Sequence, residues 1–578
     1  SHSQHEGMKI LLLLELLFLC HGGLGQHPNR RKVTLYGTDD PLVILDNASF
    51  DTSVVGSSTA WVVQFYNSWC GHCINYAPHW KLFAEQVKGW WHTVKVAVLD
   101  CSTEDNTKLC RDYEINGTPT IRIFPPNTTQ GFLGYTTRAR DVPEVVIAVL
   151  DFLTTQQAAG NGSATWPSLQ TYTESVSNIW EHLEISKVDK VAIVVEPNTS
   201  YIGRAAVLDL AVYRPEVSIL TMLGEEEHPS LMLMEHGSNS DKSGNDFQTT
   251  NINPGNMTSR DELVGIIKEN FNLMDEISKT TISPLATTEE GGSALDLEPN
   301  FDFSHFPKDQ VYMVDIENAI AYALRNEMAQ QSQYNTTEQA ALLDFLRVLV
   351  HHLPLRSSVS NFLNKLHNFI QQQNATIGGS EMEEAFALLS NGESSELPSV
   401  RSWVGCRGSF PRYRGYPCGL WTTFHAITVN LTHQEEVEHI LPAIHGFVKY
   451  FFGCRECSQH FQAMYASDGG TEVKTADDVV LWLWRAHNKV NLRIKGAASE
   501  DPEHPKSLFP NKNLCPLCWA SGSSGHYVDT QVLSYLRSIY GKDRITLVGT
   551  QELESSGLPE SREHTSEHTL DGHRHGFL

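Results

Sequence analysis

Phe65-Tyr66-Asn67-Ser68-Trp69-Cys70-Gly71-His72-Cys73 joins a run of apolar residues to a helical pattern and decides the fold around it. The pattern predicts a helix over residues 70–86 and further buried strands over 94–99 and 120–124. Strands that alternate with helical stretches indicate βαβ units. The sequence therefore predicts an α/β domain over residues 33–155.

The two cysteines of this stretch form a Cys-x-x-Cys motif suited to thiol–disulfide exchange. The thiolate is the reactive species, and a helix N-terminus at Cys70 favours it because the unsatisfied amides and the helix dipole stabilise negative charge. Cys73 follows one turn later, and His72 is expected to add partial positive charge. Thr118-Pro119, just ahead of a strand, suits a cis-proline apposed to the dithiol. A purely structural Cys70–Cys73 disulfide is the alternative.

A second dithiol, Cys454-Arg455-Glu456-Cys457, lies far downstream and is followed by a different pattern. Four residues of a helix predicted over 477–494 recur at helical spacing and share one face: Trp484, His487, Asn488 and Asn491. An indole to stack on, with histidine and asparagine to donate and accept hydrogen bonds, suits a fused aromatic cofactor. An amphipathic helix with its tryptophan in the core is the alternative. Zinc is the alternative for the paired Cys-x-x-Cys motifs, but zinc motifs normally lie closer together.

The first stretch, together with Thr118-Pro119-Thr120, resembles a thioredoxin domain of the protein disulfide isomerase type. One residue departs from that pattern: Gln64 stands where the family usually has a buried Asp or Glu for proton transfer, and an amide cannot act as a base. Residues 165–275 resemble a second thioredoxin domain, and they contain no cysteine. That domain is expected to pack or bind without exchanging disulfides.

The downstream constellation resembles the Erv/ALR sulfhydryl oxidase domain, and the domain order resembles the quiescin sulfhydryl oxidase family. The resemblance implies that FAD is the cofactor, with no metal, and that these residues contact it: Arg414, Trp421, His425, Glu456, His460, Trp484, His487, Asn488, Lys489, Val490, Asn491, Lys506 and Phe509. Relatives often carry Trp where this chain has Phe509, so an indole hydrogen bond is expected to be lost.

The resemblance implies a FAD-dependent sulfhydryl oxidase that converts protein thiols to disulfides during the folding of secreted proteins. Electrons would pass from Cys70/Cys73 to Cys454/Cys457, then to FAD and O₂, with release of hydrogen peroxide. Two other classes stay open: a disulfide isomerase whose C-terminal bundle is inactive, and a secreted adhesive or matrix glycoprotein that uses its disulfides structurally. A flavin absorption band in the purified protein would separate the oxidase from the isomerase.

The fold class is therefore multidomain: two thioredoxin-like α/β domains, then an all-α helical spacer, then an all-α FAD-binding Erv/ALR helical bundle. The expected parts are 1–25 leader and signal peptide, 33–155 redox-active thioredoxin domain, 165–275 thioredoxin-like domain without a dithiol, 296–399 helical spacer, 400–545 Erv/ALR domain and 546–578 disordered tail. The spacer shows helical spacing but no residues of obvious chemical use. The polar stretch 237–256 is expected to be a loop, and the linker 277–296 is the candidate hinge between the two dithiols.

An apolar run after Met8-Lys9, with small residues behind it, predicts a signal peptide cut near Gly25. The run is too short to cross a bilayer, which needs about 20 apolar residues. Eight Asn-x-Ser/Thr sequons are candidate glycosylation sites: Asn47, Asn127, Asn161, Asn198, Asn256, Asn335, Asn374 and Asn430. We expect a secreted protein that passes through or resides in the ER and Golgi.

Apart from Cys20 in the predicted signal peptide, the cysteines outside the two dithiols are expected to form structural disulfides within sequence-adjacent couples: Cys101, Cys110, Cys406, Cys418, Cys515 and Cys518. Cys515/Cys518 also suits an accessory redox pair. The net charge of −25 argues against nucleic acid as a partner, because no basic surface is left to neutralise a polyanion. The expected partners are reduced secretory or extracellular proteins and dioxygen, with no membrane span and a monomeric chain.

Overall fold

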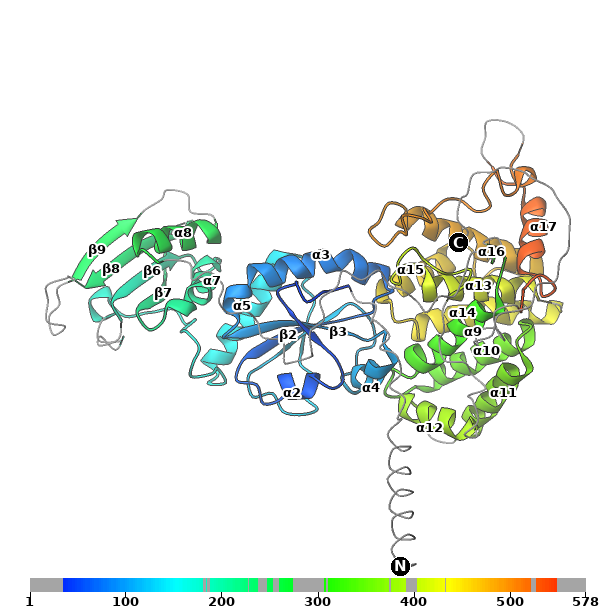
Figure 1. Cartoon of the computed structure of the whole chain (residues 1–578), viewed down its shortest axis with the longest axis horizontal. Coiled ribbons are helices and arrows are strands. Elements are labelled where there is room, and N and C mark those ends of the chain that lie inside the picture. Colours follow the sequence, from blue (N-terminus) through cyan, green and yellow to red (C-terminus); the bar gives the residue numbers. More distant parts are fainter. Residues whose placement is uncertain are drawn as a thin grey trace, which may run out of the picture. The chain divides into compact units, whose positions relative to one another are not determined.

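The computed structural model describes residues 35–547 except 180–182, 184–187, 227, 237–246, 253–258, 274–305, 308–309, 374–375, 391–402, 432 and 521–525 (Figure 1). Several sequence predictions lie outside these residues: the signal peptide 1–25, the hinge 277–296, nearly all of the tail 546–578, and the sequons at Asn256 and Asn374. Among the described residues, no helix combines the length and the apolar character needed to cross a membrane.

The first α/β domain is built on a five-stranded sheet in the order β1-β3-β2-β4-β5, with β1, β3 and β2 parallel and the other two strands antiparallel. The strands are β1 Val43–Leu45, β2 Ala60–Tyr66, β3 Val94–Asp100, β4 Thr120–Phe124 and β5 Tyr135–Thr137. The helices are α2 Phe50–Val54, α3 Gly71–Gln86, η1 Lys88–Trp90, α4 Glu104–Asp112 and α5 Val142–Ala158. The strands and the helix predicted from the apolar runs are confirmed to within one residue at each end.

Helices cover both faces of this sheet, with α3 and α5 on one side and α2 and α4 on the other (Figure 1). All seven residues of β2 are buried because the strand is central and covered twice. Val62 packs toward α3 and α5, whereas Val63 and Phe65 pack toward α2 and α4. The end of β2 leads directly into Cys70, so the sheet fixes the position of the first dithiol.

The second α/β domain has a four-stranded sheet in the order β7-β6-β8-β9. Its elements are η2 Val176–Asn178, β6 Lys190–Glu196, α7 Ile202–Asp209, η3 Ala211–Tyr213, β7 Val217–Leu223, β8 Ser230–His236, β9 Phe247–Ile252 and α8 Arg260–Asn270. The loop expected over residues 237–256 is wrong in its second half, because β9 pairs antiparallel with β8 along six residues. A polar edge strand lacks the apolar signal of a buried strand, although threonines such as Thr249 and Thr250 suit a strand well.

The remainder of the described chain is helical. Its elements are α9 Met313–Tyr322, the π-helical η5 Ala323–Met328, α10 Thr336–His352, α11 Ser357–Gln372, α12 Gly379–Leu389, α13 Gly415–Val429, η6 Gln434–Glu436, α14 Val437–Tyr450, α15 Arg455–Ser467, α16 Ala476–Ile494, η7 Pro516–Cys518 and α17 Asp529–Tyr540. A capping box at Asn335 and Glu338 starts α10. Spacer and bundle share one hydrophobic core, in which Phe345 of α10 stacks on Phe447 of α14 with ring centroids 4.4 Å apart.

Candidate active site

The first dithiol sits at the start of α3, where Cys70 is the N-cap residue and Cys73 lies one turn inside the helix. Both thiols are free and buried. Burial opposes ionisation of Cys70, but hydrogen bonds from the Cys73 thiol and from the backbone N–H groups of Cys73 and His72 outweigh it and lower the pKa of Cys70. Burial and the neighbouring Cys70 raise the pKa of Cys73 well above its usual value. Cys70 is therefore the nucleophile of the pair, as the helix position predicts.

The proton-transfer position near this dithiol is occupied by Gln64, as the sequence indicates. Gln64 is fully buried on β2, and its Oε1 accepts a 2.5 Å hydrogen bond from the hydroxyl of Tyr36. Burial, together with the nearby Tyr66 and Cys73, raises the pKa of Tyr36 well above its usual value. Neither side chain can act as a base near neutral pH. Strand β2 therefore supplies no carboxylate for proton transfer at Cys73.

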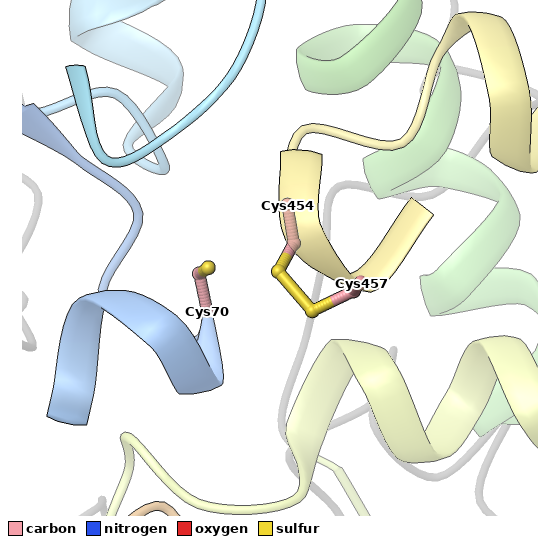
Figure 2. A group of neighbouring side chains, drawn as sticks. All are labelled: Cys70, Cys454 and Cys457. Atoms are coloured by element: carbon pink, nitrogen blue, oxygen red, sulfur yellow. A yellow bond between two sulfur atoms is a disulfide. The ribbon is translucent and has the colours of Figure 1, made fainter. Parts of the chain in front are cut away.

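The second dithiol repeats this local geometry at the start of α15, where Cys454 is the N-cap residue. Cys454 and Cys457 are joined in a disulfide. The sulfur atoms of Cys70, Cys454 and Cys457 all lie within 4.8 Å of one another, and Figure 2 shows Cys70 facing the disulfide. Three sulfurs at this spacing also suit a metal ion, but two of them are joined to each other, which favours disulfide exchange.

The backbone before the cis-proline holds the second dithiol in place. The Thr118–Pro119 bond is cis, as predicted. The N–H of Thr118 donates a 2.8 Å hydrogen bond to the carbonyl of Gly453, and Thr118 forms an isolated parallel bridge with Cys454. The backbone of the thioredoxin domain thus binds the segment before Cys454 through one isolated β-bridge.

An aromatic cluster surrounds this contact and includes a residue from the spacer. The indole Nε1 of Trp69 donates a 2.6 Å hydrogen bond to the hydroxyl of Tyr322 on α9. Trp69 also lies edge-on to Tyr416 and stacks on Phe452, with ring centroids 5.1 Å and 5.3 Å away. The spacer thus contacts the first dithiol motif directly through Tyr322, and no local pattern around Tyr322 marked this contact beforehand.

His72, Glu456 and His460 form a polar contact between the two motifs. Nδ1 of His72 lies 3.3 Å from a carboxylate oxygen of Glu456, and the rings of His72 and His460 stack with centroids 6.3 Å apart. Burial lowers the pKa of His72 despite the opposing effect of Glu456, so the imidazole is neutral at pH 7 in this arrangement. The positive charge expected from His72 is thus not supplied here. Glu456 and His460, predicted as FAD contacts, lie outside the cavity described next.

A cavity of about 250 Å³ opens beside Cys457 between α13, α15 and α16. Seven of the predicted cofactor or redox residues line it: Arg414, Cys457, Trp421, His487, Val490, Asn491 and Lys506. Sequence reasoning missed Arg412, Phe461 and Arg493, which also line it, and Trp69 and His72 border it from the thioredoxin side. Trp421 stacks on His487 with centroids 4.1 Å apart and an interplanar angle of 5°.

The chemistry of the cavity walls fits a planar, anionic cofactor such as FAD. Burial lowers the pKa of Arg414 to about 10 and, aided by Arg414, that of Lys506 to about 8, so two cations lie together without full hydration. Such a pair suits a diphosphate. Nε2 of the buried His425 lies 2.9 Å from Nδ1 of His487, whereas Nδ1 of His425 has no hydrogen-bond partner among the described residues.

Several other residues predicted to contact FAD do not line the cavity, and most of them hold its walls in place. The indole Nε1 of Trp484 donates to the carbonyl of Phe509, and Asn488 both donates to that carbonyl and accepts from the N–H of Phe509 at 2.8 Å. Lys489 points elsewhere, because its ammonium pairs with Asp468 at 2.6 Å. Trp484 and Asn488 therefore fix the segment that carries Lys506.

The remaining cysteines pair as the sequence predicts. The structure contains disulfides between Cys101 and Cys110, Cys406 and Cys418, and Cys515 and Cys518.

Comparison with known proteins agrees with this combination of a thiol-exchange domain and a helical cofactor-binding bundle. Family models match residues 41–142 (Thioredoxin), 307–409 (Flavin adenine dinucleotide (FAD)-dependent sulfhydryl oxidase) and 418–510 (Erv1 / Alr family). Sulfhydryl oxidase 1 of Mus musculus is 34% identical, over 88% of this chain and 67% of its own length. Sulfhydryl oxidase 2 of Homo sapiens is 32% identical, over 88% of this chain and 73% of its own.

The fold and the site thus define a thiol oxidoreductase with a flavin-type domain, and the chain belongs to the sulfhydryl oxidase family of flavin-linked thiol oxidases. It spans 64% of the length of human sulfhydryl oxidase 1, to which it is 33% identical. A solved structure described as Sulfhydryl Oxidase Fragment of Human QSOX1 is 36% identical over 42% of this chain and 99% of its own, with a TM-score of 0.40.

Proposed function

We propose that this chain oxidises the thiols of secretory or extracellular proteins to disulfides by a two-site relay. The observation that carries the proposal is that Cys70 faces the Cys454–Cys457 disulfide within 4.8 Å, while Cys457 borders the cavity. A relay needs one sulfur that receives the electrons and a second sulfur, beside the cavity, that passes them on. Cys454 and Cys457 occupy these two places.

The first half of the relay takes place on the thioredoxin domain. A substrate thiolate attacks Cys70 of the oxidised Cys70–Cys73 pair, forming a mixed disulfide and releasing Cys73 as a thiolate, which takes up a proton. A second substrate thiol resolves the mixed disulfide, which leaves an oxidised substrate and a reduced pair. The N–H of Thr118, which binds Gly453 in this arrangement, is the backbone group available to a substrate strand when the domains are apart.

The second half of the relay passes between the domains. The Cys70 thiolate attacks Cys454, the Cys454–Cys457 bond breaks, and Cys457 leaves as a thiolate beside the cavity. Cys73 then displaces Cys454 from Cys70. FAD supplies the two-electron acceptor and the route to dioxygen, which is reduced to hydrogen peroxide. Arg414 and Lys506 would bind its diphosphate, and Trp421, His425, His487 and Asn491 its rings and ribose.

We also propose the following features of the chain. The domain limits are those given by the sequence, the structural disulfides stabilise the folds that carry the dithiols, and the sequons at Asn47, Asn127, Asn161, Asn198, Asn335 and Asn430 are glycosylation sites. We further propose that the protein acts in the secretory pathway or outside the cell and is a monomer. The helical spacer and the bundle form one unit, because they share a core.

Oxygen consumption tests the relay. Wild type should consume oxygen with a reduced protein and with dithiothreitol. Cys70→Ser/Cys73→Ser should lose turnover of the protein and keep slow turnover of dithiothreitol, which reaches Cys454 directly. Cys454→Ser/Cys457→Ser should lose both, and normal oxygen consumption by that variant would exclude the relay. Purified protein without a flavin absorption band would instead favour an isomerase.

A further inference from the structure

A buried carboxyl group from the spacer lies where the two redox motifs meet. Glu327 is 3% exposed and belongs to the π-helical segment η5, outside both Cys-x-x-Cys motifs. The N–H of Gly453, the residue before Cys454, donates a hydrogen bond to a carboxylate oxygen of Glu327. Short π-helical segments occur frequently at functional sites.

The thioredoxin domain closes over the same point. A Cβ placed on Gly453 would lie 2.9 Å from Nδ2 of Asn67 and 3.2 Å from a carboxylate oxygen of Glu327. Asn67 comes three residues before Cys70, so Glu327 and the first dithiol approach Gly453 from two sides. Glycine is the only residue that fits between them without displacement.

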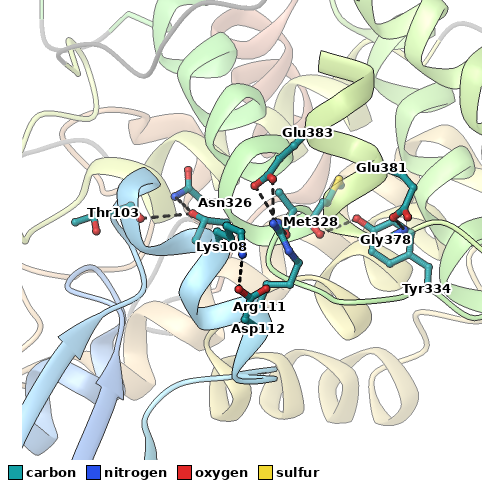
Figure 3. Close-up of polar contacts among 12 residues, drawn as sticks. Thr103, Lys108, Arg111, Asp112, Asn326, Met328, Tyr334, Gly378, Glu381 and Glu383 are labelled. Carbon is teal, nitrogen blue, oxygen red and sulfur yellow. Dashed lines mark hydrogen bonds and ion pairs between the residues drawn. The ribbon is translucent and has the colours of Figure 1, made fainter. Parts of the chain in front are cut away.

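Segment η5 itself is part of the contact between the domains. Asn326, the neighbour of Glu327, donates a 3.2 Å hydrogen bond to the hydroxyl of Thr107 on α4, in the region drawn in Figure 3. Gln330 donates a 2.7 Å hydrogen bond to the carbonyl of Ile115. The position of Glu327 is thus fixed by the docked thioredoxin domain as well as by its own helix.

The charges around Glu327 make its protonation state sensitive to Cys70. Burial raises the pKa of Glu327 to about 8; the hydrogen bond from Gly453 opposes this shift, and the nearby Cys70 adds to it. The other titratable groups near it are Tyr322 of α9 and Tyr416 of α13, and burial raises the pKa of both well above the usual value. An ionised Glu327 and a Cys70 thiolate, both buried, therefore repel each other.

Glu327 can exchange protons with solvent through a second cavity. This cavity has a volume of about 240 Å³ and is bordered by Glu327, Gly453, Lys449 and Arg455. The two cations are the charged groups that face it from α14 and α15. A proton can therefore enter or leave Glu327 while the domains stay docked.

We propose that Glu327 is a positioning residue whose proton permits the attack of Cys70 on Cys454. The inference rests on the proposed relay. In the step, the Cys70–Cys454 bond forms and the Cys454–Cys457 bond breaks. The electron pair leaves on Cys457, so the Cys70 sulfur is oxidised and the disulfide is reduced. Glu327 keeps its proton throughout. In this neutral form it does not repel the Cys70 thiolate.

The sign of the pH effect follows from the raised pKa of Glu327. Below about pH 8 the carboxyl group is neutral and the Cys70 thiolate is tolerated. As the pH rises through about 8, Glu327 ionises, and at pH 9 the interdomain step is about tenfold slower than it would be without this carboxyl group if only the neutral form supports it. A dithiol without this carboxyl group would instead react faster as the pH rises.

Single-turnover reduction of the flavin in the full chain, followed by its absorbance from pH 6 to 9, tests the proposal. With a reduced protein substrate, the rates of wild type and Glu327→Asp, each divided by the rate of Glu327→Gln at the same pH, should show an alkaline decrease of about tenfold between pH 7 and 9. Asp315→Asn is the matched control: Asp315 is a buried carboxyl of α9 that binds the N–H groups of Val404 and Cys406, so its loss should leave the alkaline decrease in place.

Two further measurements separate the possible failures. Dithiothreitol, which reduces Cys454 directly, should reduce the flavin with the same pH dependence in wild type and Glu327→Gln, which also shows that the variant is folded. A ratio of wild-type to Glu327→Gln rates that is the same at pH 7 and pH 9 overturns the role of Glu327. Protein-driven flavin reduction that persists in Cys70→Ser overturns the relay itself.

Discussion

The two dithiols have the same backbone setting and opposite surroundings. Cys70 and Cys454 are each the N-cap residue of a helix, with the second cysteine one turn inside it. Cys73 is fully buried in the core of its own domain, whereas Cys457 is partly exposed at the wall of the larger cavity. Each motif thus places its first cysteine at a helix N-terminus, and the two motifs differ in the packing around the second cysteine.

The strongest test of this comparison is to remove the second cysteine of each motif. In Cys73→Ser/Cys457→Ser the remaining thiols have no other partner within their motifs, so we expect a stable Cys70–Cys454 disulfide in most molecules after mild oxidation. Mass spectrometry of a non-reducing digest would detect the linked peptides. Cys73→Ser/Cys454→Ser is the matched control and should give little cross-link, and a Cys70–Cys457 link of equal yield would show that the two cysteines of the second motif are equivalent.

The cavity beside Cys457 can be tested through its cations. Lys506→Met should weaken FAD binding by about 10- to 100-fold, because a hydrogen bond to a charged group contributes about 1.5–3 kcal/mol. Wild-type affinity should fall as the pH rises through about 8, since Lys506 then loses its proton in the open cavity. Fluorescence of released flavin measures both effects. Lys489→Met is the control, and an equal loss there would contradict the assignment of the cavity.

The sequence predicts the elements around both dithiols well because their signals are local. Buried strands appear as apolar runs, and a Cys-x-x-Cys motif at a helix start carries its own chemistry. Of the four residues on the predicted helical face, His487 and Asn491 line the cavity and Trp484 and Asn488 do not, and the assignment of this face to the cofactor stays a prediction. Lys489 is two residues from His487, which is about 200° around a helix, and it lies on the other side.

The contributions of the spacer could not be predicted, for a physical reason. Tyr322 and Glu327 acquire their roles only by contact with residues more than 100 positions away, and π-helical geometry leaves no simple spacing in the sequence. Glu456 and His460 sit on the helix that carries the second dithiol, but they face His72 of the other domain. Pairing between domains is decided by tertiary packing, which local patterns do not record.

A smaller effect on turnover is expected when the ion pair between α4 and the spacer is removed. Arg111 is buried and forms two 2.9 Å hydrogen bonds with Glu383, and it also donates to the carbonyl of Ala329 (Figure 3). Because the side chain of Glu383 is 44% exposed, solvent screens the ion pair and limits its contribution to the stability of the contact to about 1 kcal/mol. Glu383→Gln should slow turnover of reduced protein by about fivefold and leave dithiothreitol oxidation unchanged. Asp112→Asn, which removes the surface pair with Lys108 on the same helix, should change neither rate.

The smallest effect on catalysis is expected at the third Cys-x-x-Cys motif, Cys515-Pro516-Leu517-Cys518. Its disulfide is absent from the lining of the cavity beside Cys457, and Cys518 packs in the shared helical core. Cys515→Ala/Cys518→Ala should therefore keep oxygen consumption within about twofold of wild type with either thiol substrate. Closing so short a loop contributes about 2 kcal/mol in the loop-entropy model, so the unfolding midpoint should fall by a few degrees. Lost turnover in a variant that still retains flavin and the fold would instead make this pair a third redox site.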